Sequence, residues 1–339
     1  MTLFSDEDFS DHPITRSPDP KPMVYTNSSM SRLTRAQLAA YIFLCLVWGS
    51  TWLAIRAVVR DVPPFKAAAI RFLVAAGILF AWARFRKAKW PSDERQWNAI
   101  FILSFTIMAI PYGLLFWAEQ YVSSSMTAVL FSAMPLAVAL FTPLMMHRHV
   151  PRQAVFAMLM AFGGLLVLLY TELGSAGRTL WGGVAVLTSM LLSSWSVVFA
   201  KKRLHDVDPV VATGLQLLIG SVGLFWATWA LESHEQTHWS RPAIAAMAFL
   251  VTFGSAGAFA VYYWLLKQMQ PYQLSTISLV TPVIAVLEGA LVFREPVPWT
   301  MVVAIAVVLG SVGAVLYAEA ETQGTGIQIF PVQERQENK

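Results

Sequence analysis

Two charged side chains lie inside long apolar stretches of the chain. Arg71 falls within 65–83 and Glu288 within 273–293. Charge is costly inside a membrane, so such residues are functional candidates by default. We hypothesise that Arg71 and Glu288 are close enough to pair, directly or through a bound solute. The alternative is a structural ion pair or snorkelling to the membrane interface.

Two prolines occupy the middle of apolar stretches, Pro135 in 124–146 and Pro282 in 273–293, the stretch that also holds Glu288. Proline removes a helical hydrogen bond and kinks the helix. Carbonyls freed at membrane depth are tolerated where neighbours satisfy them or where they face a cavity. The prolines therefore predict a solute cavity, to which Ser278 offers a hydroxyl. A kink for shape alone, or packing by small polar residues, is the alternative.

Aromatic side chains supply the rest of the predicted cavity, because flat faces stack on organic solutes or hold a cation. Ordinary packing is the alternative for each of them. The predicted substrate-cavity residues are Trp48, Tyr112, Pro135, Trp195, Tyr262, Trp264, Ser278 and Pro282.

Enzyme chemistry has little support in the sequence. The six histidines fall in the tail or in loops, and Cys45 is the single cysteine, so we expect no metal site, no cofactor and no catalytic residue. A P-loop of the Gly-x-x-x-x-Gly-Lys type is absent, which leaves no motor for ATP-driven pumping. The net charge of +4 is too small to argue for a nucleic-acid partner.

The elements that position these residues follow from composition. Of 339 residues, 56% are hydrophobic and 13% are charged, against about 25% charged in a soluble domain. This excludes a purely soluble protein and makes the lipid bilayer the expected partner. A spanning helix needs about 20 apolar residues. The sequence predicts an all-α integral membrane protein with ten transmembrane helices, near 37–58, 65–83, 97–118, 124–146, 152–171, 180–200, 209–231, 242–265, 273–293 and 299–319.

The two halves of the chain resemble each other at an offset of 147 residues, which aligns Trp48 with Trp195 and Pro135 with Pro282. Five helices per copy is an odd number, so consecutive copies enter the membrane from opposite sides. Inverted repeats are typical of secondary transporters with alternating access. We predict repeats over 36–173 and 174–320, between disordered cytoplasmic tails at 1–35 and 321–339.

The loops orient the chain. With the N-terminus inside, thirteen Lys and Arg side chains fall on the inner side and six on the outer side. Positive charge concentrates in cytoplasmic loops. We therefore predict a multi-pass protein of the cell (inner) membrane with both termini cytoplasmic.

Short motifs occur in order along both repeats, namely Trp48-Gly49-Ser50-Thr51-Trp52, Ala69-Ile70-Arg71-Phe72, Ala118-Glu119-Gln120-Tyr121, Met134-Pro135-Leu136, Thr281-Pro282-Val283 and Glu295-Pro296. With these motifs the chain resembles the EamA family of the drug/metabolite transporter superfamily. His147-Arg148-His149 departs from the family's glycine–glutamate turn. Neither 37–58 nor 180–200 contains an acid, which argues against the cation–proton antiport of the related small multidrug transporters.

The resemblance implies a secondary transporter that exports small organic metabolites such as amino acids. Its expected partners are a small-molecule substrate and a second copy in a homodimer. The alternatives are a non-transporting membrane scaffold or regulatory protein and, less favoured, a membrane enzyme.

Overall fold

A computed structural model describes residues 33–122, 124–168, 180–293 and 299–317, and within them every regular element is a helix. The predicted tails lie almost wholly outside these residues, as does the predicted junction at 173–174. The first part of the chain forms α1 (Arg35–Val59), α2 (Pro64–Phe85), α3 (Glu94–Leu103), the π-helix η1 (Ser104–Ala109), α4 (Ile110–Ala118), α5 (Ser124–Phe131), α6 (Met134–Met146) and α7 (Arg152–Leu168). The second part forms α9 (Leu180–Arg203), α10 (Pro209–Leu231), α11 (Arg241–Val251), the π-helix η2 (Thr252–Gly257), α12 (Ala258–Gln268), α13 (Pro271–Ser275), α14 (Ile277–Phe293) and α15 (Trp299–Tyr317).

Seven helical stretches in the described residues are long and apolar enough to cross a membrane. They are Arg35–Val59, Pro64–Phe85, Glu94–Ala118, Thr127–Met146, Leu180–Arg203, Pro209–Leu231 and Arg241–Gln268. Three of the ten predicted spans fall short of this length: α7 and α14 have 17 residues each, and the apolar part of α15 is Val302–Tyr317. The structure thus supports an all-helical membrane protein and seven of the ten predicted spans.

The offset of 147 residues reappears in the helix bounds. The π-helix η1 begins at Ser104 and η2 at Thr252, within one residue of that offset. A helix break precedes α6 in one copy and α14 in the other. The contacts between the two copies are equivalent as well. Helix α1 of the first copy packs on α14 of the second, and α9 of the second copy packs on α6 of the first. The chain therefore has a two-repeat architecture.

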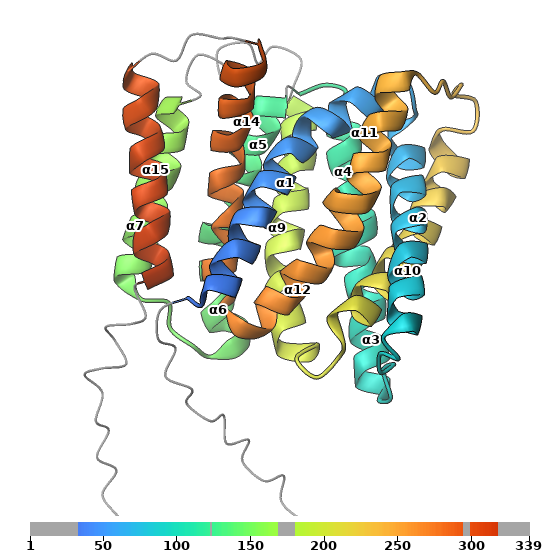
Figure 1. Cartoon of the computed structure of the whole chain (residues 1–339), viewed down its shortest axis with the longest axis horizontal. Coiled ribbons are helices and arrows are strands. Elements are labelled where there is room, and N and C mark those ends of the chain that lie inside the picture. The colour runs from blue at the N-terminus through green and yellow to red at the C-terminus, as the bar shows by residue number, and fades with distance from the viewer. Residues whose placement is uncertain (1–32, 123, 169–179, 294–298, 318–339) are drawn as a thin grey trace, which may run out of the picture.

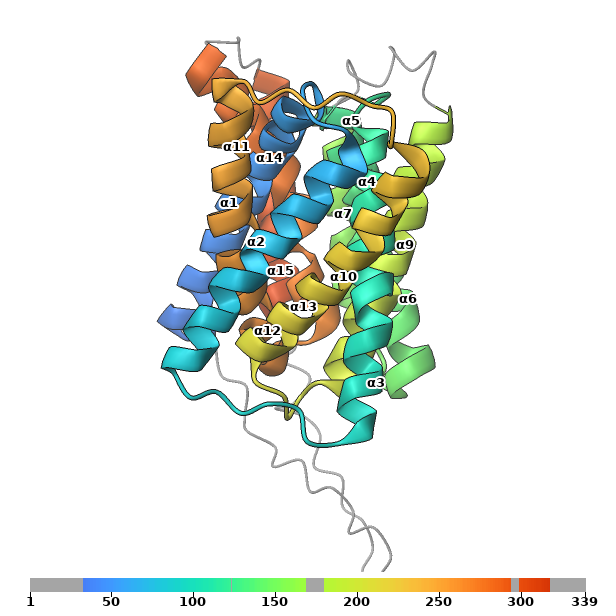
Figure 2. The same cartoon turned by 90° about the vertical axis from the view of Figure 1, so that its right-hand side faces the viewer.

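Two helix pairs join the repeats at opposite edges of the molecule. In Figure 1, α7 lies beside α15 at one edge and α2 beside α10 at the other, and both pairs are in contact. Figure 2 views the α2–α10 edge directly. The helices between these edges supply the centre of the structure, where α1 meets α14 closely. A Cβ built on Gly49 of α1 would lie 2.6 Å from the Ile284 Cβ, so glycine is what permits this approach.

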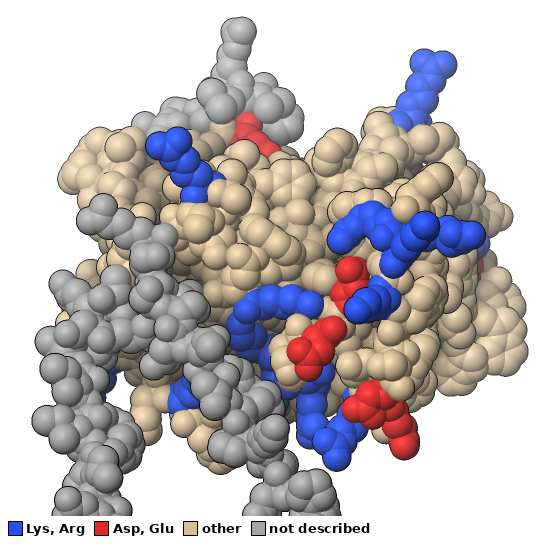
Figure 3. Space-filling model, turned by 60° about the horizontal axis from the view of Figure 1, so that its bottom comes forward, with Lys and Arg blue, Asp and Glu red and all other residues tan. Residues whose placement is uncertain are grey.

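Basic side chains gather at the end of the molecule where α9 ends and α3 begins (Figure 3). Some of them cap the C-termini of other helices: Lys201 Nζ donates to the Leu266 carbonyl of α12 at 2.6 Å, and Lys202 Nζ donates to the Met145 carbonyl of α6 at 2.8 Å. Cations at helix C-termini satisfy unpaired carbonyls and complement the helix dipole. The basic side chains at this end thus stabilise helix termini, and they are also the basis of the predicted orientation.

Candidate functional site

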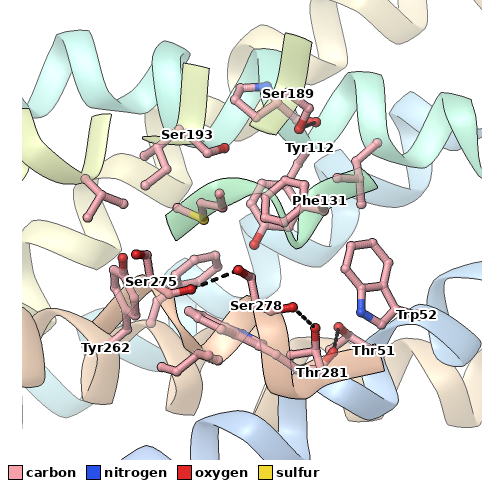
Figure 4. A pocket seen from close by; sticks show the side chains of 18 of the residues that line it. Thr51, Trp52, Tyr112, Phe131, Ser189, Ser193, Tyr262, Ser275, Ser278 and Thr281 are labelled. Atoms are coloured by element: carbon pink, nitrogen blue, oxygen red, sulfur yellow. Dashed lines mark hydrogen bonds between the residues drawn. The ribbon is translucent and has the colours of Figure 1, made fainter. Parts of the chain in front are cut away.

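A cavity of about 100 Å³ lies between the two repeats, bounded by both (Figure 4). Its lining from the first repeat is Trp48, Thr51, Trp52, Ile55, Arg71, Ile107, Pro111, Tyr112, Leu115, Phe131 and Met134. Its lining from the second repeat is Ser189, Ser193, Val197, Phe259, Tyr262, Leu274, Ser275, Ile277, Ser278 and Thr281. Two separate parts of the chain, Trp48 to Met134 and Ser189 to Thr281, therefore build one site.

Four of the eight residues predicted for a cavity line this one, namely Trp48, Tyr112, Tyr262 and Ser278. The structure does not bring the two prolines into the lining. Their preceding residues, Met134 and Thr281, take those places. Pro135 lies in the first turn of α6, where the backbone N–H that proline lacks would have no helical partner. Pro282, by contrast, lies inside α14. Each proline thus follows a lining residue on its helix and is not itself part of the lining.

The other two predicted aromatics point elsewhere. Trp195 stacks on Phe199 of the same helix, with ring centroids 4.9 Å apart. Trp264 is 38% exposed and belongs to the outer surface of α12. Trp48, the repeat equivalent of Trp195, instead packs on Tyr262 with ring centroids 5.2 Å apart. Equivalent tryptophans in the two repeats therefore have different surroundings.

Arg71 is 1% exposed and is held by the π-helix η2. Its Nε donates to Ser255 Oγ at 2.7 Å, and its Nη2 donates to the Gly254 carbonyl at 3.0 Å. Trp48 Nε1 donates to the same carbonyl at 3.3 Å. A π-turn closes its hydrogen bonds one residue later than an α-turn and is frequent at functional sites. Here η2 provides the acceptors that position a buried guanidinium beside the cavity.

Three aromatic rings surround the Arg71 guanidinium. Its Cζ lies 5.3 Å from the centroid of Tyr112 and 5.7 Å from those of Phe72 and Phe116. Ring faces attract a cation at such distances. Phe259 links this group to Trp48, with ring centroids 5.8 Å from Tyr112 and 5.7 Å from Trp48. The guanidinium is therefore surrounded by packed aromatic rings.

The hypothesis that Arg71 pairs directly with Glu288 is wrong for this structure. The Glu288 carboxylate accepts a hydrogen bond from the Ser50 hydroxyl, and the Arg71 partners are Ser255 and Gly254. Glu288 is also outside the cavity lining. The two intramembrane charges consequently serve different helix contacts, Arg71 joining α2 to η2 and Glu288 joining α14 to α1.

Serine and threonine hydroxyls line the cavity, and the sequence did not single out Thr51, Ser189 or Ser193 for it. Figure 4 shows Ser189 and Ser193 on one side of the space and Ser275, Ser278 and Thr281 on the other. The spacing of Ser189 and Ser193 in the sequence indicates that they lie together, because residues four apart share one helix face. Ser189 and Ser193 are such a pair on α9. Within the described residues, no group of three or more His, Cys, Asp and Glu could hold a metal ion.

These hydroxyls donate their hydrogens to the backbone. Ser189 Oγ donates to the Pro111 carbonyl at 3.0 Å, which ties α9 to α4. Ser278 Oγ donates to the Ser275 carbonyl at 2.8 Å. Their oxygen lone pairs stay available to a ligand, because a hydroxyl has one donor and two acceptor positions. The site thus combines a cation, aromatic faces and hydroxyl oxygens, which suits binding of a small organic molecule.

Comparisons with known proteins agree with this picture. Protein PagO of Salmonella typhimurium is 27% identical over 249 residues, which are 73% of this chain and 81% of that protein. An uncharacterized inner membrane transporter of Escherichia coli, YedA, is 27% identical over 284 residues, covering 82% of this chain and 91% of that protein. An uncharacterized transporter of Bacillus subtilis, YoaV, is 25% identical over 260 residues, covering 76% and 88%.

A solved crystal structure shares the fold, with a TM-score of 0.69 and 18% identity over 83% of this chain and 96% of that one. The EamA-like transporter family matches twice, over residues 36–170 and 180–317. These ranges follow the two repeats seen in the structure and cover most of the chain. The chain is a multi-pass membrane protein that belongs to the EamA-like transporter family.

Proposed function

We propose that the chain is a secondary transporter that exports small organic metabolites such as amino acids. The observation that carries this proposal is the central cavity, whose walls come from both repeats. A site at the boundary of two similar halves is where alternating access needs it, since one half can rock against the other around a fixed site. Family membership and the printed names of the relatives support transport as the class of activity.

The proposed architecture has ten transmembrane helices in two inverted repeats, with both termini in the cytoplasm. The recurrence of helix bounds and of the two π-helices at nearly the same offset supports the repeat. The cluster of Lys and Arg at one end supports the orientation (Figure 3). Reporter tags inserted at positions 89 and 205 test this, because both should lie in the cytoplasm, whereas a tag at 175 should lie outside. Opposite sides for 89 and 205 would exclude the scheme of five plus five helices.

Flux through the purified protein tests the function. A panel of amino acids and other metabolites is first screened for solutes that raise the melting temperature in detergent. Uptake of each hit is then measured in proteoliposomes. A Ser193→Phe variant fills the cavity and should abolish flux, while Ala81→Phe, on an exposed face of α2, should not. Flux equal to that of empty liposomes for every hit would favour the non-transporting scaffold.

A further inference from the structure

The cavity carries one charge. Among the described residues that line it, Arg71 is the one with an ionisable side chain charged at neutral pH, and none of them is acidic. Glu288 lies outside the lining, and the described residues show no ion pair between it and Arg71. A buried cation is costly unless it is hydrogen-bonded and paired with an opposite charge. The described lining supplies Arg71 with hydrogen bonds and aromatic faces, but with no anion.

The Arg71 guanidinium also has donors to spare. It has five N–H groups, and the protein accepts from Nε and from Nη2. Nη1 is buried and has no hydrogen-bond partner among the described residues. An arginine that already uses one edge on the protein therefore keeps a second nitrogen for a ligand.

Two further buried donors of the lining lack partners in the described structure. They are Trp52 Nε1 and the Tyr262 hydroxyl. Figure 4 places Trp52 and Tyr262 at opposite ends of the space, so they would meet different parts of one occupant. The lining hydroxyls of Ser189 and Ser278, by contrast, already donate to backbone carbonyls. The lining thus has hydrogen-bond donors without partners among the described residues, and these donors call for an occupant rich in acceptors.

We propose that the cavity selects small organic anions, with a carboxylate accepting from Arg71 Nη1 and an apolar body against the rings of Trp48 and Tyr112. This deepens the proposed transport function and rests on it for its biological meaning. An apolar cavity of about 150 Å³ holds one benzene ring. The volume of about 100 Å³ is smaller than this, so it suits a short branched chain directly and a single ring only with small shifts of the lining side chains. A cation of the same shape meets the Arg71 charge and is rejected.

Three probes of nearly identical shape test the charge preference: benzoate, benzamide and benzamidine, which are anionic, neutral and cationic at pH 7.5. Binding of each is measured by calorimetry on the full chain in detergent. We expect benzoate to bind about 10- to 100-fold more tightly than benzamide, the range for a hydrogen bond between charged groups. Benzamidine should not bind. Equal affinity for benzoate and benzamide, binding of benzamidine, or binding of none of the three would overturn the proposal.

Variants then assign the preference to Arg71. Arg71→Gln should bring the benzoate and benzamide affinities together, and Arg71→Lys should keep a weaker preference for benzoate. Arg84→Gln removes an exposed cation from the same helix and should leave the preference unchanged. Ser255→Ala keeps the Arg71 charge but loses its Nε acceptor, so the preference should survive even if stability falls. A preference that persists in Arg71→Gln refutes the assignment.

The two proposals fail differently. Flux of neutral or cationic metabolites, together with equal benzoate and benzamide affinities, would overturn anion selection and leave transport standing. Benzoate binding with the expected preference but no flux of any solute would overturn transport and leave the anion site standing.

Discussion

Glu232 should stabilise the start of α2 from the other repeat, and its loss should be measurable. The residue before α2 is Pro63, which has no side-chain cap to offer. The Glu232 carboxylate supplies one instead, accepting from Phe65 N at 2.7 Å and from Lys66 N at 2.9 Å. Because four N–H groups at a helix start have no intrahelical partner, an acceptor there satisfies them, and a negative charge complements the dipole.

The magnitude follows from those two hydrogen bonds. Glu232→Ala leaves both N–H groups without their acceptor, which should cost about 1–2 kcal/mol, as for loss of a capping side chain. This lowers the melting temperature by about 2–4 °C in a domain of ordinary size, so we expect about 2 °C in a chain this long. Melting is followed by tryptophan fluorescence on the full chain in detergent. Scans are compared at one heating rate because unfolding of such proteins is often irreversible.

The effect of the buried Glu232 charge on stability is opposite to that of its two hydrogen bonds. Burial, helped by the nearby charge of Glu235, raises the pKa of Glu232 above its ordinary value of 4.5 despite the N–H groups of Phe65 and Lys66, which lower it. The folded state therefore binds this proton more tightly than the unfolded chain does. Its contribution to stability is complete below the ordinary pKa and is lost as pH rises through the raised pKa.

Glu232→Gln separates the two effects. The amide keeps one acceptor oxygen and removes the buried charge, so at pH 7.5 it should cost less than half of the alanine effect, roughly 0.5 kcal/mol or less. The melting temperature of the wild type minus that of Glu232→Gln should fall between pH 4.5 and pH 7.5. Glu235→Ala removes an exposed neighbouring carboxylate and is the control. Equal melting of Glu232→Ala and Glu235→Ala would refute the capping role, and a difference that grows with pH would refute the sign.

Two further predictions concern packing and capping. Gly49→Ala places a Cβ 2.6 Å from Ile284 Cβ, and this overpacking should lower the stability by about 1–3 kcal/mol. The control is Gly77→Ala, whose Cβ meets no atom within 4 Å, so its effect on stability should be neutral or stabilising. Equal melting temperatures of the two variants would contradict the close approach of α1 and α14. Asp208→Ala removes the Oδ1 acceptor of the first N–H groups of α10 and should cost about 1 kcal/mol. Arg86→Ala removes the 3.8 Å contact with Asp208, on a side chain 46% exposed, and the approach of the Arg86 guanidinium to the Trp82 ring at 5.2 Å. It should cost about 0.5 kcal/mol, less than Asp208→Ala. Because Asp208→Ala removes the same ion pair as well as the cap, an equal or larger loss in Arg86→Ala on the same melting assay would contradict the capping role of Asp208.

The helix layout could be predicted because polar residues interrupt the apolar stretches in the sequence itself. The prediction of 209–231 matches α10, Pro209–Leu231, because Asp208 and Pro209 mark its start and Glu232 its end. The repeat was equally visible, since an offset of 147 residues needs no knowledge of packing. What such patterns contain is the length and order of the helices.

The direction of a side chain is a different matter in a membrane. In a soluble helix the polar face marks the solvent side, but these helices are apolar on both the lipid face and the packed face. Trp48 and Trp264 are therefore alike in sequence, although one lines the cavity and the other is 38% exposed. The sequence did not predict the π-helices for a related reason. A backbone hydrogen bond made one residue later in the turn requires no particular amino-acid composition.

Arg71 shows where both kinds of information meet. An arginine inside an apolar stretch was a clear functional candidate, but its partners could not be read from the sequence, because Gly254 contributes only a backbone carbonyl. A carbonyl accepts whatever residue bears it, so only the position of η2 reveals it.

The two repeats share their helices and their π-turns but not their polar groups, and this difference is what a selective site requires. Each π-helix is tied to the facing repeat, η2 through Trp48 Nε1 to the Gly254 carbonyl at 3.3 Å, and η1 through Ser196 Oγ to the Thr106 carbonyl at 2.9 Å. Arg71, however, has Leu218 as its equivalent. One buried cation without a symmetric counterpart is neutralised by one carboxylate, whereas two would repel each other across the space. In the proposed transport cycle, similar scaffolds let the halves exchange conformations, and in the proposed anion site a single unmatched arginine gives the solute one orientation.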